Sequence, residues 1–140
     1  RLALDIKERV LAELMAITDQ QDKFRYLIEK GQMAPALSAE QRQDKYLIKG
    51  CLSQLWLVPG YRDGLVHFLV DSDAAIPKGI AAVLAEIFSG LTPDEVLATD
   101  VNFLREVGIE QHLSMNRRNG LANLGQQIRL YATAFKMMRS

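Results

Sequence analysis

The chain has 140 residues, the length of one ordinary domain and enough to bury a core without disulfides or a structural metal. Seventeen basic residues balance seventeen acidic ones, so the chain lacks the excess of positive charge that nucleic-acid binding usually needs. No apolar run approaches the roughly 18 residues of a membrane span, so we expect no membrane partner. The one cysteine, Cys51, excludes an internal disulfide and a multi-cysteine metal site.

The expected location is the cytoplasm, because a chain with one cysteine suits a reducing compartment. The sequence begins at Arg1 rather than at a methionine, which leaves a removed organelle-targeting peptide open.

Two helices are predicted at the N-terminal end. Apolar residues at helical spacing run from Leu4 to Ile17, and Asp19 or Gln20 interrupts the pattern. A second periodic segment is predicted to stop at Gly31, as a glycine just past a helix end. Residues 32–44 lose the period and are predicted to be a loop.

The middle of the chain favours strands. Residues 55–58 and 65–70 are apolar and partly β-favouring, and residues 59–64, with Pro59 and Gly60, are predicted to form the turn of an antiparallel hairpin. Residues 46–49 are predicted to add a third short strand.

The helical period returns after residue 73. A helix is predicted from Ile76 to Phe88, a second begins with the Thr92-Pro93-Asp94-Glu95 start signal, and a third runs through 103–107. The last helix is predicted to begin near Ser114. This order predicts an α+β domain with helices over one face of an antiparallel sheet.

Cys51 and His112 are the first candidates for chemistry. An isolated cysteine most often acts as a small buried apolar residue, and spacing alone favours that role for Cys51. A Cys51–His112 pair, oriented by Asn116 or Asn119, would resemble a peptidase dyad, but no local protease signature surrounds Cys51. Two histidines and one cysteine also make a poor zinc site.

Charged residues give two further candidates. Asp71 and Asp73 precede a helix, where capping and a favourable interaction with the helix dipole are the simplest roles. Arg117 and Arg118 fall in the first turn of the last helix, where the dipole disfavours cations. A carboxylate partner, an anion or persulfide contact, or simple solvation would each explain this pair.

Three stretches together resemble the SufE family of small proteins, which accept sulfur from cysteine desulfurases. They are residues 48–57 (IKGCLSQLWL), 71–79 (DSDAAIPKG) and 111–121 (QHLSMNRRNGL), in the family's order and spacing. The resemblance implies one SufE-like domain over residues 1–140, with a small three-stranded antiparallel sheet covered by helices, SufE/IscU-like. Leu52, Leu55 and Met115 depart from the common pattern and leave the desulfurase paralogue open.

The resemblance also implies roles for individual residues. Cys51 matches the sulfur-accepting cysteine, Arg117 an arginine close to it, and Asp73 an acidic residue beside the active loop. His112 belongs to the C-terminal motif with Asn119 and Gly120, where a scaffold role is as plausible as a direct one.

The implied partners are a cysteine desulfurase of the SufS or CsdA type and a downstream iron–sulfur scaffold that receives the sulfur. The chain itself would be a sulfur carrier and desulfurase activator rather than an enzyme. It would need no cofactor, because the pyridoxal phosphate chemistry belongs to the desulfurase.

Three alternatives come from other readings of the same residues. A cysteine hydrolase would use the Cys51–His112 pair, and a paralogous relay would deliver sulfur to another pathway such as tRNA modification. An iron–sulfur scaffold needs about three or four cysteine-type ligands, which one cysteine cannot supply.

Overall fold

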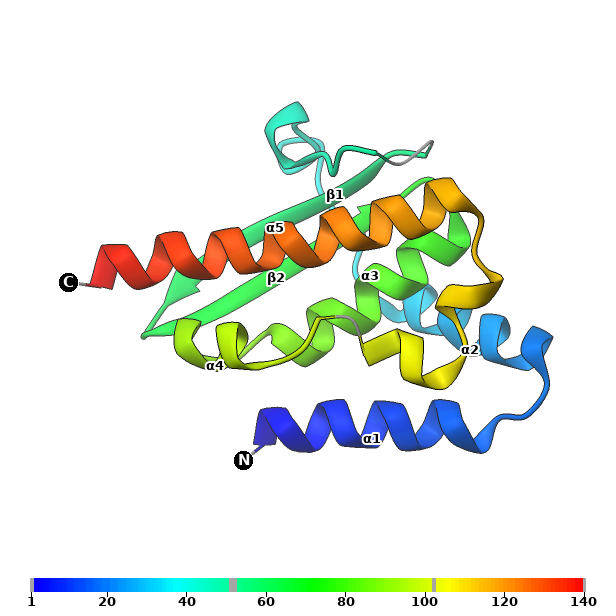
Figure 1. The fold of residues 1–140 in the computed structure, drawn as a ribbon. Helices are drawn as coiled ribbons and strands as arrows, with labels where there is room; N and C mark the ends of the chain where they lie inside the picture. Colours follow the sequence, from blue (N-terminus) through cyan, green and yellow to red (C-terminus); the bar gives the residue numbers. More distant parts are fainter. Residues whose placement is uncertain (1, 51–52, 102, 140) are drawn as a thin grey trace.

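The computed structural model describes residues 2–50, 53–101 and 103–139, and its helices cover a small antiparallel sheet (Figure 1). The strands are β1 (Leu55–Arg62) and β2 (Leu65–Ser72). The α-helices are α1 (Leu2–Ala16), α2 (Gln20–Met33), α3 (Ala75–Phe88), α4 (Pro93–Ala98) and α5 (Met115–Arg139). Three 3-10 helices complete the order: η1 (Asp44–Tyr46), η2 (Phe103–Val107) and η3 (Glu110–His112).

The mixed α+β class is confirmed, but the three-stranded sheet is wrong: the described part of the chain forms a two-stranded sheet. Residues 44–46 turn as η1, and the strand-type pairing of this segment with β1 is, in the described residues, an isolated bridge between Leu47 and Trp56. There the Ile48 amide donates to the Leu55 carbonyl at 2.8 Å. One bridge before the turn at Gly50 is too short a pairing to make a strand.

The hairpin is confirmed, but its turn is the dipeptide Asp63-Gly64 rather than residues 59–64. Both residues have positive φ, 56° and 76°, the signature of a two-residue type I′ turn. Pro59 therefore lies within β1, opposite Phe68. The Phe68 amide donates to Ser89 Oγ at 3.0 Å, away from β1, so this pair exchanges no ladder bond and the missing N–H of Pro59 costs nothing.

Two predictions about the N-terminal helices have opposite outcomes. Asp19 interrupts the pattern as predicted: its Oδ1 accepts from the Gln21 amide at 2.8 Å and caps α2. Gly31 does not end the helix, which continues to Met33. It is buried against Gly79 of α3, where a Cβ on Gly79 would overlap the Leu27 backbone, so the glycine pair serves close helix packing.

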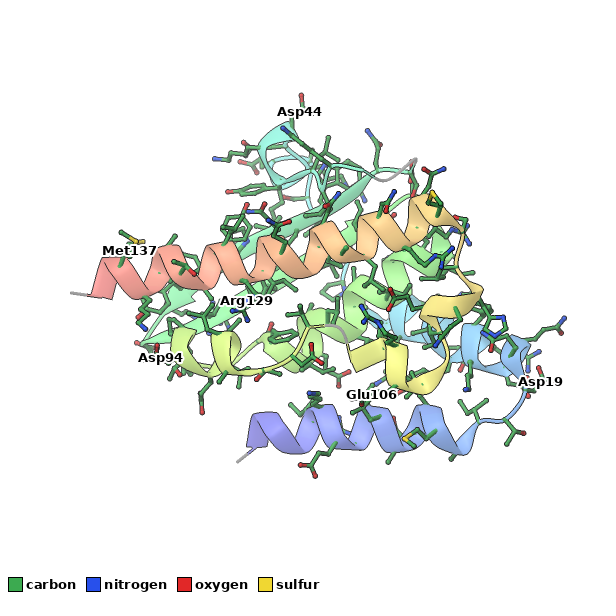
Figure 2. All side chains as sticks on the ribbon, viewed as in Figure 1. Asp19, Asp44, Asp94, Glu106, Arg129 and Met137 are labelled. Carbon is green, nitrogen blue, oxygen red and sulfur yellow. The ribbon has the colours of Figure 1, made fainter. Side chains whose placement is uncertain are left out.

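The predicted start of α4, in the C-terminal half of the chain, is confirmed. Thr92 and Glu95 form a reciprocal capping box at α4, with the Glu95 amide 3.1 Å from Thr92 Oγ1. The Arg129 side chain of α5 donates to the Leu97 carbonyl at 2.9 Å and ties α5 to the end of α4 (Figure 2). Phe135, further along α5, stacks on Tyr61 of β1 and so holds the long helix against the hairpin.

Candidate functional site

Residues 48–50 and 53–54, called the Cys51 loop below, lie outside helices and strands on either side of Cys51. The Ile48–Leu55 hydrogen bond and the Leu47–Trp56 bridge bring the two sides together. Cys51 and Leu52, and with them the predicted burial of the thiol, lie outside the described residues. Figure 1 places the flanking residues beside the N-terminal half of α5.

Three side-chain and backbone contacts from the end of β2 hold the C-terminal end of this loop. Asp73 Oδ1 accepts from the Gln54 amide at 3.0 Å, and the Asp73 amide donates to the Gln54 carbonyl at 3.3 Å. Ser72 Oγ donates to the same carbonyl at 2.5 Å. Asp73 thus orients the backbone three residues after Cys51, although its carboxylate is otherwise exposed.

These contacts replace the predicted capping role of the acidic residues. The N-cap of α3 is Ala74, which makes no side-chain cap bond, and neither Asp71 nor Asp73 faces the first turn as a cap. Asp73 bonds Gln54, while Asp71 bonds Arg42 and the Leu37 amide. The capping prediction is therefore wrong, because both carboxylates bind groups that lie far away in the sequence.

Asn123 of α5 holds the N-terminal end of the loop. Its Nδ2 donates to the Lys49 carbonyl at 2.6 Å. Gly50 follows with φ of 87°, and a Cβ there would overlap the Asn123 amide nitrogen. The left-handed backbone conformation favours glycine immediately before Cys51, and the small residue leaves room for the Asn123 amide.

A cavity of about 350 Å³ adjoins the loop between α3 and α5. Its polar lining includes Ser53, Ser114, Asn116 and Arg117, and the rest of the lining is mostly apolar: Leu55, Ala74, Pro77, Ile80, Leu121 and Leu124. An apolar space with a guanidinium beside it suits a polarisable sulfur that carries negative charge during reaction.

The predicted site residues of the C-terminal motif differ in whether they border the cavity. Ser114 Oγ accepts from the Arg117 amide at 3.3 Å, so α5 starts where predicted and both arginines lie in its first turn. Arg117 and Arg118 are both exposed, and within the described lining of the cavity only Arg117 takes part. His112 is exposed at the end of η3, and neither it nor Asn119 is among the described lining residues.

A family model described as "SufE: Fe-S metabolism associated domain" matches residues 8–132. The chain belongs to the SufE family. Its role therefore lies in iron–sulfur metabolism, in which SufE proteins act as accessory factors. The fold is also similar to the solution structure of a hypothetical protein from Thermus thermophilus. That protein is 18% identical, with a TM-score of 0.76 over 95% of this chain and 96% of the other, and it supports the SufE-like fold alone.

The contact between Asn123 and the Cys51 loop was not predicted from the sequence. It lies in α5 between Leu121 and Leu124, where a lone polar residue is unremarkable, and its partner is a backbone carbonyl 74 positions away. The available signal was Gly50, since a glycine before a candidate nucleophile indicates that something approaches the backbone closely.

Asp71 is buried near the end of β2, opposite Trp56 of β1. Its Oδ2 accepts from Arg42 at 2.7 Å and from the Leu37 amide at 3.1 Å, and Lys78 lies 3.5 Å from Oδ1. Burial alone would raise the pKa of Asp71. The bonds from Arg42, Leu37 and Ser72 and the charge of Lys78 outweigh that effect and hold the pKa below its usual value.

Two features are absent from the described residues. They contain no group of three or more His, Cys, Asp or Glu side chains placed to hold a metal ion. Across the same residues, no helix combines the length and apolar character needed to cross a membrane.

Proposed function

We propose that this chain takes a sulfur atom from the persulfide of a cysteine desulfurase onto Cys51, stimulates the desulfurase, and relays the sulfur to an iron–sulfur scaffold. One observation carries the proposal. The one cysteine of this SufE-family chain is preceded by Lys49, which Asn123 holds, and followed by Ser53, which lines a cavity together with Arg117, and by Gln54, which Asp73 holds.

The proposed transfer needs one thiolate and no oxidant. The Cys51 thiolate attacks the outer sulfur of the donor persulfide and forms a new S–S bond. The old S–S bond breaks, its electron pair leaves on the desulfurase cysteine as a thiolate, and the proton stays on the outer sulfur. Cys51 is then a persulfide, and the numbers of S–S bonds and electrons are unchanged.

The same residues support a carrier that keeps its sulfur. A second cysteine in the chain could discharge the persulfide as a disulfide, and the sequence has none. A free thiol with a pKa of about 8.5 is mostly protonated at neutral pH, so a cation beside it increases the reactive fraction. Arg117 is the cation that we assign to this role.

The direct test mixes the protein with a cysteine desulfurase and cysteine and then measures the intact mass. We expect a gain of one sulfur atom that reductant removes and that maps to Cys51. A hydrolase using Cys51 and His112 would show no such gain and would instead turn over a reactive ester. Ester turnover without the mass gain would replace the proposed relay with the hydrolase.

We expect alkylation of Cys51 by iodoacetamide to be slow in the free protein and faster once a desulfurase binds. The reason is that the adjoining apolar cavity offers shelter to a thiol, which must become accessible for transfer. Labelling is followed by mass spectrometry, with glutathione as the unprotected reference. Labelling of the free protein at the rate of glutathione would contradict the shelter.

Replacing Arg117 with alanine should slow formation of the Cys51 persulfide about tenfold at neutral pH. A loss of one pKa unit of thiolate stabilisation corresponds to about 1.4 kcal/mol, or a factor of ten. Quenched-flow mixing with persulfidated desulfurase, read by mass, gives the rate.

Arg118→Ala is the matched control, because it removes another exposed guanidinium one residue away that is not part of the described cavity lining. Adjacent helical side chains diverge by about 100°, so Arg118 should matter little. If both substitutions left the rate of persulfide formation unchanged, Arg117 and Arg118 would be solvated surface charges without a role at Cys51.

A further inference from the structure

The contact between Asn123 and the Cys51 loop has two components, both made by the side-chain amide nitrogen of Asn123. One is the short hydrogen bond from Nδ2 to the Lys49 carbonyl, 2.6 Å, which joins residues far apart in the sequence. The other is steric, because Gly50 lies so close to the Asn123 amide that a Cβ would overlap it. The asparagine side chain therefore contacts the backbone at both of the residues just before Cys51.

Two hollows border α5 near the contact between Asn123 and Lys49. Toward Ser53, α5 contributes Gly120, Leu121 and Leu124 to the cavity of about 350 Å³. Toward Lys49, a second hollow of about 680 Å³ is lined by Asn123 itself together with Gln126, Gln127 and Leu130. Asn123 thus meets the loop on the part of α5 that lies between two hollows, where little packing could substitute for the hydrogen bond.

The two ends of the loop are held in different ways. At Gln54 the restraint comes from Asp73 and Ser72 of the hairpin, through three hydrogen bonds. At Lys49 the described restraint to α5 is Asn123, on the same helix that carries Arg117 six positions earlier. One helix therefore fixes the loop and also contributes the guanidinium beside its cavity.

We propose that Asn123 is a positioning residue for the sulfur acceptor: its hydrogen bond holds Lys49 and Gly50, the residues directly before Cys51, against the helix that carries Arg117. The proposal rests on the proposed function for its biological meaning. Its physical content, the dependence of the Cys51 thiol on the Asn123 amide, is measurable without any sulfur transfer.

Two substitutions remove the donated hydrogen bond in different ways. Asn123→Ala truncates the side chain, and Asn123→Leu keeps a similar size and branching without a donor. Alanine and leucine are better helix formers than asparagine, so α5 should not be weakened. Gln126→Ala is the control, because it removes an exposed carboxamide three residues further along α5 and bordering the same hollow.

The experiment measures the rate of Cys51 alkylation by iodoacetamide against pH, with the thermal midpoint of each variant as a check on folding. The plateau at high pH reports access to the ionised thiol, and the midpoint of the profile reports the thiol pKa. A lost hydrogen bond of ordinary strength predicts a plateau about five- to tenfold higher for both Asn123 variants. Persulfide formation with desulfurase should slow in the same two variants.

The proposal is supported if both Asn123 variants change the alkylation profile while Gln126→Ala matches the wild type at an unchanged thermal midpoint. It is overturned if the profiles of Asn123→Ala and Asn123→Leu equal the wild-type profile. It is equally overturned if Gln126→Ala changes the profile as much as they do. Failure of the sulfur relay itself would appear separately, as normal alkylation behaviour with no sulfur gained from the desulfurase.

Discussion

Replacement of Cys51 with serine should abolish stimulation of the desulfurase and all gain of sulfur by the chain. A hydroxyl is a far weaker nucleophile than a thiolate at neutral pH and cannot form a persulfide. The sequence offers no second cysteine to take over, so the expected loss is complete rather than partial. Sulfide release from cysteine by a desulfurase, with and without the variant, measures the effect.

Cys51→Ser also contains its own control for folding and binding. The substitution changes one atom of the side chain, so the thermal midpoint should stay near the wild-type value. If the variant still docks on the desulfurase, an excess of it should compete with wild-type protein and lower the stimulated rate. Full stimulation by the variant alone would refute the relay through Cys51.

Much of the fold follows from local chemistry that the sequence displays. Asp19 and the Thr92–Glu95 capping box satisfy helix-end amides within a few residues of themselves. Ser114 begins α5 for the same reason. The hairpin also depends on local chemistry, although Pro59-Gly60 resembles a turn more strongly than the true turn, Asp63-Gly64. Pro59 fits within β1 because the amide of its partner, Phe68, donates to Ser89 rather than to β1.

The features that escaped prediction depend on partners far away in the sequence. Gly31 has the sequence pattern of a helix end, but it packs against Gly79. Asp71 and Asp73 have the pattern of helix caps, but they bind residues of the 37–54 segment. Periodicity and spacing carry no information on such pairs. The same limit explains why family resemblance pointed to Cys51, Arg117 and Asp73, whereas Asn123 emerged only from the structure.

Asp71 should be the largest single electrostatic contributor to stability near the site. Its side chain is 4% exposed, against 44% for Arg42 and 23% for Lys78, so the carboxylate is the buried member of the cluster. Arg42 also lies over the ring of Trp56, the cross-strand partner of Asp71. The carboxylate thereby fastens the loop before η1 onto the sheet face that carries Trp56.

Asp71→Asn should lower the free energy of unfolding by about 2–3 kcal/mol at pH 7, because a neutral amide leaves Arg42 and Lys78 without their buried counter-charge. The pKa of Asp71 is lowered in the folded protein. Its contribution is therefore fully present above the unfolded value of about 3.9 and is lost as the pH falls through the lower folded value. Urea unfolding of both proteins from pH 7 to pH 3 measures the difference, which should be constant down to about pH 4.5 and then shrink.

Asp22→Asn is the matched control for this difference. Asp22 pairs with Arg25 at 2.9 Å, three residues away on α2, and both side chains are exposed. Because water screens such a pair, its loss should cost less than about 1 kcal/mol at pH 7. A cost for Asp71→Asn no larger than this control, or a difference that grows as the pH falls below about 4, would show that the buried carboxylate does not fasten the loop as an anion.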